Sequence, residues 1–180
     1  FSTVDTWFAT LAYSLQIYFD FSAYSEMALG IGMMFGVILP LNFNSPYKAT
    51  SIIDFWSRWH MTLSRFIKEY VYIPLGGNQT NQTRNIIFTM SLAGLWHGSG
   101  LNFLAWGSLH GILIGSNHLL RRYGIFPTFP DFLKIFFTFI LINTTWIFFR
   151  SPSFNESFQV LYHYIGFSSA TGFPFGIIVF

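Results

Sequence analysis

Apolar residues run in long stretches along this chain, and polar residues gather in the shorter segments between them. Stretches 6–39, 86–120 and 132–149 are each long enough to cross a bilayer, because 18 or more predominantly apolar residues can span its hydrocarbon core. Another apolar stretch begins near Phe173. The pattern predicts an all-α, multi-span integral membrane protein in which residues 1–180 belong to one transmembrane domain.

Segment 51–73 has a different pattern. Its apolar residues recur at helical spacing, while the opposite face is charged. The pairs Asp54–Arg58 and Arg65–Glu69 have the i,i+4 order that stabilises a helix. We therefore predict an amphipathic helix that lies in the membrane interface or re-enters the protein.

Stretch 86–120 is interrupted by the sequence GSG at 98–100. It forms either one long tilted span or two shorter segments that meet at the glycines. Five basic residues in segment 40–85 favour the cytoplasmic side, and Arg121 and Arg122 compete for the same side. Both groups can face the cytoplasm only if 86–120 is a hairpin or a re-entrant element, so the orientation stays open.

Composition supports the membrane interpretation. Hydrophobic residues make up 52% of the chain, charged residues 9%, and the mean hydropathy is +0.47. The formal net charge is +2, and the few basic residues are scattered, which argues against nucleic-acid binding. Cysteine is absent, which excludes disulfides and thiol chemistry. Because the chain opens on Phe1 and closes on an apolar run, we expect it to be part of a longer polypeptide.

His97 is the first candidate for catalysis, because it lies deep in an apolar stretch within GLWHG, residues 94–98. A neutral imidazole can accept a proton, and Gly98 and Gly100 leave room for a substrate beside the ring. The alternative is a hydrogen-bonded core histidine that links helices. His110 is the second candidate; on an unbroken helix it would lie about 220° around the axis from His97.

Three further ionisable residues lie outside that stretch. His60, at the edge of the amphipathic segment's apolar face, is expected to support a site or to lie in the interface beside tryptophans. Asp20 and Glu26 lie within stretch 6–39, where ionised groups are costly and usually functional. They are interpreted as a proton relay, an acceptor-positioning pair or buried polar links between helices. Gly30, Gly32 and Gly36 predict close helix packing nearby.

Other catalytic patterns are missing from the sequence. There is no HExxH set, no cluster with zinc-ligand spacing, no P-loop and no GxSxG elbow. We therefore predict no metal site and no bound cofactor.

Five motifs, in this order, resemble the membrane-bound O-acyltransferase (MBOAT) family, most closely its bacterial AlgI-like alginate O-acetylase branch. They are QIYFDFSAYSEMA (16–28), FWSRWHMTLS (55–64), YVYIPLGGN (70–78), GLWHG (94–98) and WGSLHG (106–111). Ser57 stands where the branch has the first arginine of RRWH, and Gln79 stands where a basic residue often follows GGN. Either difference could alter substrate or partner contacts.

The resemblance implies the C-terminal portion of an MBOAT-type fold with a tunnel or funnel. It places the catalytic histidine on His97 and a second active-site histidine on His60. We expect His110, Asp20, Glu26, Trp96, Asn102 and Arg58 to support the site or line the substrate. The donor implied is acetyl-CoA or another thioester. The partners implied are the lipid bilayer, a polysaccharide or envelope polymer, and periplasmic acetyltransferase proteins, in a bacterial inner membrane.

Alternatives remain at this stage. The D-alanyl transferase branch, DltB, shares the RWH and WHG motifs. A transporter or channel could use Asp20, Glu26 and the histidines to line a proton or solute path. A non-catalytic subunit of an export complex is a third alternative.

Overall fold

The computed structural model of this chain describes residues 2–125 and 128–166, which contain helices and no β-strand. The all-α prediction is therefore confirmed. In chain order, the elements are α1 (Thr3–Met34), the 3-10 turn η1 (Pro46–Lys48), α2 (Ile52–Trp56), α3 (Met61–Ile67), the π-helical turn η2 (Lys68–Tyr72), α4 (Gln82–His97), α5 (Leu101–Arg122), α6 (Asp131–Arg150) and α7 (Phe154–Tyr164).

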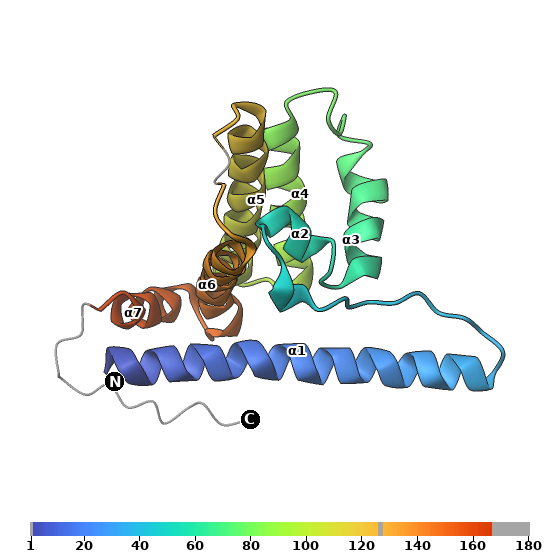
Figure 1. Cartoon of the computed structure of the whole chain (residues 1–180), viewed down its shortest axis with the longest axis horizontal. Helices are drawn as coiled ribbons and strands as arrows, with labels where there is room; N and C mark the ends of the chain where they lie inside the picture. Colours follow the sequence, from blue (N-terminus) through green and yellow to red (C-terminus); the bar gives the residue numbers. More distant parts are fainter. Residues whose placement is uncertain (1, 126–127, 167–180) are drawn as a thin grey trace.

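The helices form two groups that cross at a steep angle instead of one parallel bundle. In Figure 1, α1 lies along the base of the molecule, and the paired helices α4 and α5 stand across it. Helix α3 stands beside this pair, while α6 and α7 lie near the crossing point. The 32 residues of α1 give it a length of about 48 Å at 1.5 Å per residue.

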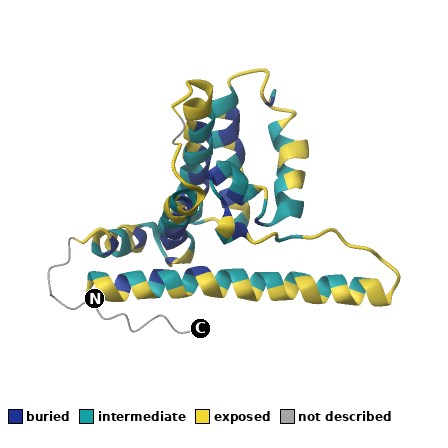
Figure 2. Cartoon of the chain, viewed as in Figure 1, coloured by how far each residue is buried: buried dark blue, intermediate teal, exposed yellow. Residues whose placement is uncertain are grey.

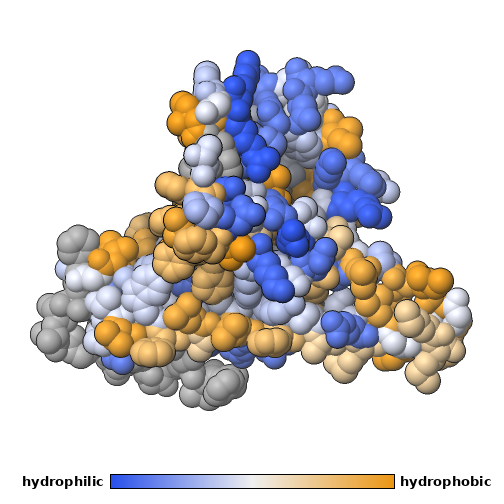
Figure 3. Space-filling view, in the orientation of Figure 1, coloured by the Kyte–Doolittle hydropathy of each residue, from blue (hydrophilic) through white to orange (hydrophobic). Residues whose placement is uncertain are grey.

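Helix α1 presents two contrasting faces. Its N-terminus is closed by a capping box between Ser2 and Asp5. Small polar residues on one face are buried against the other helices. The outer face is mostly apolar and exposed, as Figures 2 and 3 show; it carries Val4, Phe8, Leu15, Phe19, Met27 and Ile31 together with the exposed Asp20 and Glu26. An apolar face of this length suits lipid or another protein segment better than water.

The prediction of one continuous amphipathic helix over 51–73 is wrong. The structure divides it into α2, α3 and η2, with a break at His60, whose φ of 43° and ψ of 55° lie in the left-handed region. The Asp54–Arg58 pair forms, with Nε 2.7 Å from Oδ1. The Arg65–Glu69 pair is not among the ion pairs of the described residues, because the helix changes from α to π at position 68 and loses i,i+4 alignment.

Stretch 86–120 is a hairpin, which settles one alternative left open by the sequence. Helix α4 ends at His97, a short turn over 98–100 follows, and α5 returns antiparallel alongside it. The N-terminus of α4 and the C-terminus of α5 therefore lie at the same end, so Arg84, Arg121 and Arg122 share one end of the hairpin.

A glycine seam, formed by Gly94 of α4 and Gly107, Gly111 and Gly115 of α5, holds the two helices close. A Cβ at Gly111 would lie 2.7 Å from Ile87 Cα, and one at Gly107 would collide with the Met90 carbonyl oxygen. Small residues four apart allow this backbone approach. The seam is reinforced by the Ser91 and Ser108 hydroxyls, whose oxygens are 2.8 Å apart.

Gly30, Gly32 and Gly36, which were expected to allow close helix packing, do not pack against another helix within the described part of the chain. No atom lies within 4 Å of a Cβ built at Gly30 or Gly36. Gly36 has a φ of 73° and ends the helix, which is the usual use of glycine at a helix C-terminus. The close contacts of Gly32 are local, with Val37 and Leu39.

Helix α6 agrees closely with the predicted span 132–149. In the described residues it is the one helix long and apolar enough to cross a membrane, judged by length and composition. The membrane crossing predicted over 6–39, and that of the two segments within 86–120, stay predictions, and the start expected near Phe173 lies outside the described residues. Helix α7 follows α6 and was not predicted.

Asn143 links three helices at the base of the fold. The side chain of Asn143 in α6 is fully buried, and its Nδ2 donates to the Thr10 carbonyl at 3.0 Å and to Ser14 Oγ at 2.8 Å in α1. Its Oδ1 accepts a hydrogen bond from the Tyr164 hydroxyl of α7 at 3.0 Å. A buried amide with all these partners fixes the register of α1, α6 and α7.

Candidate active site

His97 is the last residue of α4, at the base of the hairpin beside α6. Its half-buried ring lies among three aromatic rings, with centroid distances of 5.1 Å to Trp96, 5.3 Å to Trp106 and 5.3 Å to Phe149. Within residues 2–125 and 128–166, no hydrogen bond reaches either ring nitrogen. The imidazole is therefore free to bind a substrate hydroxyl.

The turn after His97 is too tight for larger residues. A Cβ at Gly98 would collide with the Phe103 ring, and one at Gly100 would collide with the Asn102 side-chain oxygen. The two glycines therefore place α5 directly against α4 and bring Trp106 to His97. Gly98 and Gly100 are therefore required for helix packing, a role that the sequence analysis did not predict when it assigned them to making room for substrate.

His60 lies at the junction of α2 and α3, where the segment after α1 returns to the core. The Met61 N–H donates to the Asn42 carbonyl at 2.9 Å, and the Asn44 N–H donates to the Arg58 carbonyl at 3.0 Å. These two bonds hold the left-handed backbone at His60, which a non-glycine residue adopts only when its surroundings enforce it.

The His60 ring has a defined tautomer. Its Nδ1 lies 3.1 Å from Asn42 Oδ1, which also accepts from the Thr62 hydroxyl at 2.9 Å. Because Oδ1 can only accept, Nδ1 carries the proton and Nε2 keeps a free lone pair. Burial, and then the nearby His97, lower the pKa of His60 to about 4, so the ring is neutral at physiological pH.

An aromatic cluster connects the two histidines. It consists of Phe21, Phe43, Trp59, Trp106, Trp146 and Phe149, with neighbouring centroids 5.0–6.4 Å apart. His60 meets this cluster through Phe21 at 4.7 Å, and His97 meets it through Trp106 and Phe149. The cluster thus makes an apolar wall between the two histidine rings.

Trp106 is notable within this wall. Its ring is 1% exposed, and its indole N–H has no acceptor among the residues that the structure describes. A buried donor without a partner is costly, so such a group is a candidate for binding a ligand.

His110 has a structural environment. Its side chain is fully buried, the Trp56 indole N–H donates to Nδ1 at 3.2 Å, and Nε2 lies 3.0 Å from the Thr145 hydroxyl. Since Nδ1 accepts, Nε2 donates to Thr145, whose hydroxyl donates to the Ile142 carbonyl at 2.7 Å. Every polar atom is satisfied, and the ring joins α2, α5 and α6.

Replacing Thr145 with valine is expected to destabilise the protein by about 1–3 kcal/mol, because it leaves the buried Nε2–H of His110 without an acceptor. Thermal unfolding of the full-length protein in detergent measures the effect. Thr89→Val is the matched control: the Thr89 hydroxyl is buried without a partner in the described part of the chain, so its removal is expected to be neutral or stabilising. Equal losses in both variants would contradict the role of His110.

Arg58 and Asn102, expected to line the substrate site, have structural partners. Arg58 pairs with Asp54, and its Nη1 donates to the Asn44 carbonyl at 3.3 Å. Asn102 is buried, and its Nδ2 donates to the carbonyls of Phe148 at 3.3 Å and Ser151 at 2.9 Å, which ties α5 to the end of α6.

Asp20, Glu26 and Trp96 are exposed in the described fold. The two carboxylates lie on α1, and no hydrogen bond or ion pair joins them to a histidine among residues 2–125 and 128–166. Trp96 is 68% exposed, although its ring adjoins His97. The same described residues hold no group of three His, Asp or Glu that could bind a metal ion.

Six residues of this region were missed from the sequence. Asn42 and Thr145, which orient His60 and His110, lie far from them in the chain, and no local pattern indicates them. Trp106 opens the WGSLHG motif and could have been singled out there. The spacing of Gly107, Gly111 and Gly115 is a recognised helix-packing signal and could also have been found.

Comparisons with known proteins place this geometry in context. Residues 1–159 match the model of the membrane-bound O-acyltransferase family. The chain is 46% identical over 177 residues to a peptidoglycan O-acetyltransferase of Helicobacter pylori, covering 94% of this chain and 33% of that protein. It is 43% identical over 162 residues to a probable alginate O-acetylase AlgI of Azotobacter vinelandii, covering 88% of this chain and 32% of that protein.

A third relative represents another activity. The chain is 34% identical over 121 residues to a teichoic acid D-alanyltransferase of Streptococcus thermophilus, covering 61% of this chain and 29% of the relative. In all three comparisons, the chain spans about a third of the length of the relative.

Proposed function

We propose, from the premise that this chain belongs to the membrane-bound O-acyltransferase family, that the protein transfers an acetyl group to hydroxyls of an exported polysaccharide. The membership agrees with the motif resemblance found in the sequence. The observation that carries the proposal is the contrast between His97, whose ring nitrogens are unpartnered in the described fold, and His110, whose ring nitrogens are both occupied.

In the proposed reaction, His97 is the general base. It takes the proton from an attacking sugar hydroxyl, and the oxygen forms a bond to the carbonyl carbon of a thioester donor such as acetyl-CoA. Collapse of the tetrahedral intermediate breaks the carbon–sulfur bond, and the protonated His97 returns its proton to the departing thiolate. The products are an O-acetylated sugar and a free thiol.

Neighbouring groups support this step. In the proposed reaction the buried Trp106 indole N–H donates to the acyl oxygen as negative charge develops there, which requires the donor to enter the aromatic cluster beside this ring. The Nε2 lone pair of His60 is available to accept a hydrogen bond from a second hydroxyl of the sugar, which would orient the substrate. The aromatic cluster excludes water, which suppresses hydrolysis of the donor.

The acceptor is proposed from the relatives. The relatives at 46% and 43% identity are named as O-acetyltransferases of peptidoglycan and alginate, while the D-alanyltransferase matches at 34% over a shorter stretch. We therefore favour acetylation of a cell-wall glycan or an exopolysaccharide over D-alanylation. The multi-pass bacterial inner-membrane location and an association with periplasmic partner proteins belong to the same proposal.

The activity is testable in cells. Deleting the gene is expected to remove base-labile acetate from the envelope polysaccharide, and restoring the full-length gene is expected to return it, because the acetyl ester has no other source in this proposal. Acetate released by mild alkali is quantified by chromatography, with ester-linked D-alanine measured in the same samples. Loss of D-alanine with unchanged acetate would contradict O-acetylation and favour the alternative branch.

A further inference from the structure

A cavity with basic residues lies at the end of the α4–α5 hairpin farthest from His97. Its volume is ≈ 390 Å³, and its lining includes Asn81, Gln82, Thr83 and Arg84 at the start of α4 and His118 and Arg122 near the end of α5. The 16 residues of α4 separate it from His97 by roughly 20 Å at 1.5 Å per residue. It is therefore distinct from the candidate active site.

Positive charge around this cavity is not neutralised by an ion pair among the residues that the structure describes. Segments 78–85 and 112–125 contain no Asp or Glu. Arg84 and Arg122 take part in none of the ion pairs found in residues 2–125 and 128–166. Arg121 is different, because its Nη2 donates to Ser51 Oγ at 3.3 Å, and it does not line the cavity.

The start of α4 adds a second source of positive potential. Its N-cap residue, Asn81, has a φ of 37°, and its side chain makes no capping hydrogen bond. The first-turn N–H groups therefore lack a side-chain acceptor beside the cavity. Exposed N–H groups and the helix dipole together favour an anion at a helix N-terminus.

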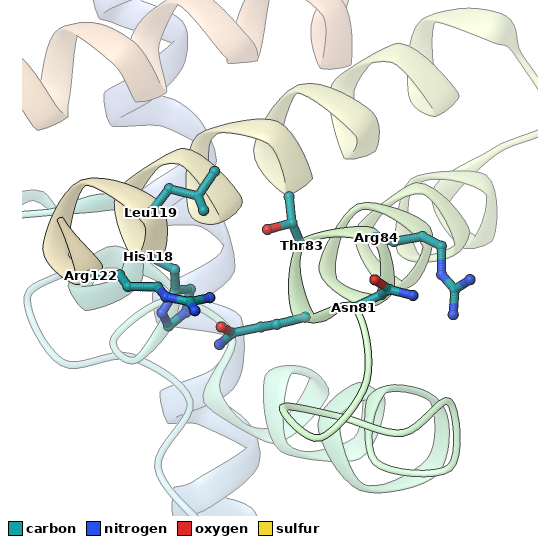
Figure 4. A pocket seen from close by; sticks show the side chains of 7 residues that line it. Asn81, Thr83, Arg84, His118, Leu119 and Arg122 are labelled. Atoms are coloured by element: carbon teal, nitrogen blue, oxygen red, sulfur yellow. The ribbon is translucent and has the colours of Figure 1, made fainter.

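We propose that this cavity binds a phosphate group, carried either by an anionic lipid headgroup or by a soluble phosphate compound. Figure 4 shows Arg122 and His118 of α5 on one side and Asn81 and Thr83 of α4 on the other, with the Arg84 guanidinium directed away from Arg122. The planar guanidinium donates two parallel hydrogen bonds to phosphate oxygens, and the amide and hydroxyl groups add further donors. Basic pockets between membrane helices bind phospholipid headgroups by this chemistry.

The test uses binding to the full-length protein, purified in detergent. Phosphatidylglycerol and phosphatidylcholine are compared by native mass spectrometry, and pyrophosphate is titrated by calorimetry. The variant Arg84→Gln/Arg122→Gln is expected to bind the phosphate ligand about tenfold or more weakly, because each basic residue near a phosphate contributes substantially to binding. The matched control is Arg65→Gln/Lys68→Gln, which removes the same charge from exposed positions in α3 and η2 and is expected to leave binding unchanged.

The lipid comparison and the pyrophosphate titration distinguish the two possible sources of the phosphate group. Selective binding of phosphatidylglycerol supports a lipid headgroup, and binding of pyrophosphate supports a soluble compound. Absence of both, or equal losses in the two double variants, would overturn the site. If the glutamine pair unfolds, Arg84→Lys/Arg122→Lys keeps the charge but loses the planar fork, and wild-type affinity in that folded variant would overturn the proposed contacts. Acetyl transfer is not measured, so failure of the proposed enzyme activity would not affect the outcome.

Discussion

Replacing His97 with glutamine is expected to lower the rate of acetyl transfer by about 10²–10⁴-fold, the usual contribution of a positioned general base. Glutamine keeps a neutral, polar side chain of similar size but cannot accept the proton of the attacking hydroxyl. The measurement is the initial rate of acetyl transfer by full-length protein in membranes, normalised to the amount of folded protein.

His163→Gln is the matched control for this substitution. His163 lies in α7, outside the candidate site, and its buried Nδ1 has no partner in the described part of the chain. Its replacement is expected to leave the rate unchanged. A His97→Gln protein that is folded and retains the wild-type rate would remove His97 from the mechanism, and with it the main support for the proposed function.

Replacing Gly107 with alanine is expected to destabilise the α4–α5 hairpin. The new Cβ would collide with the Met90 carbonyl oxygen and lie 3.0 Å from Gly94 Cα, so the hairpin would have to separate. Overpacking of this kind typically costs about 1–3 kcal/mol. A fall in the unfolding temperature of the detergent-solubilised protein measures it, with reduced activity because Trp106 adjoins the displaced residue.

Gly30→Ala tests whether the effect belongs to the seam. Gly30 also lies inside a helix, but no atom lies within 4 Å of its Cβ position, and alanine favours a helix over glycine by about 0.5–1 kcal/mol. We therefore expect no loss, or a small gain, of stability. Equal destabilisation by the two substitutions would mean that helix propensity, and not close packing, decides the outcome.

The sequence was most informative where a local pattern decides the structure. Span 132–149 became α6 almost unchanged, because a continuous apolar run has few ways to satisfy its backbone other than a helix. The glycines at 98–100 indicated a break between two helices as one of two alternatives. The candidate histidines were found because polar groups within apolar stretches are rare.

Long-range contacts set the features that the sequence did not predict. The periodicity of 51–73 predicted one helix, but bonds from Asn42 and Asn44 hold a left-handed turn at His60 and divide it. His110 resembled His97 in sequence, and only its contacts with Trp56 and Thr145, 54 and 35 residues away, distinguish their roles. Local patterns are equally limited for Asp20 and Glu26, because their roles depend on long-range contacts and the chain spans about a third of the length of its relatives.

The position of His97 at the end of α4 has a consequence for the proposed proton transfer. The last four carbonyl groups of a helix have no partner within it, and together they carry roughly half a negative elementary charge. His97 is the last residue of α4, so it lies in the turn that carries this partial charge. The imidazolium of the proposed reaction therefore lies beside partial negative charge from the α4 backbone, which the positive N-terminal end of α5 at Leu101 partly offsets.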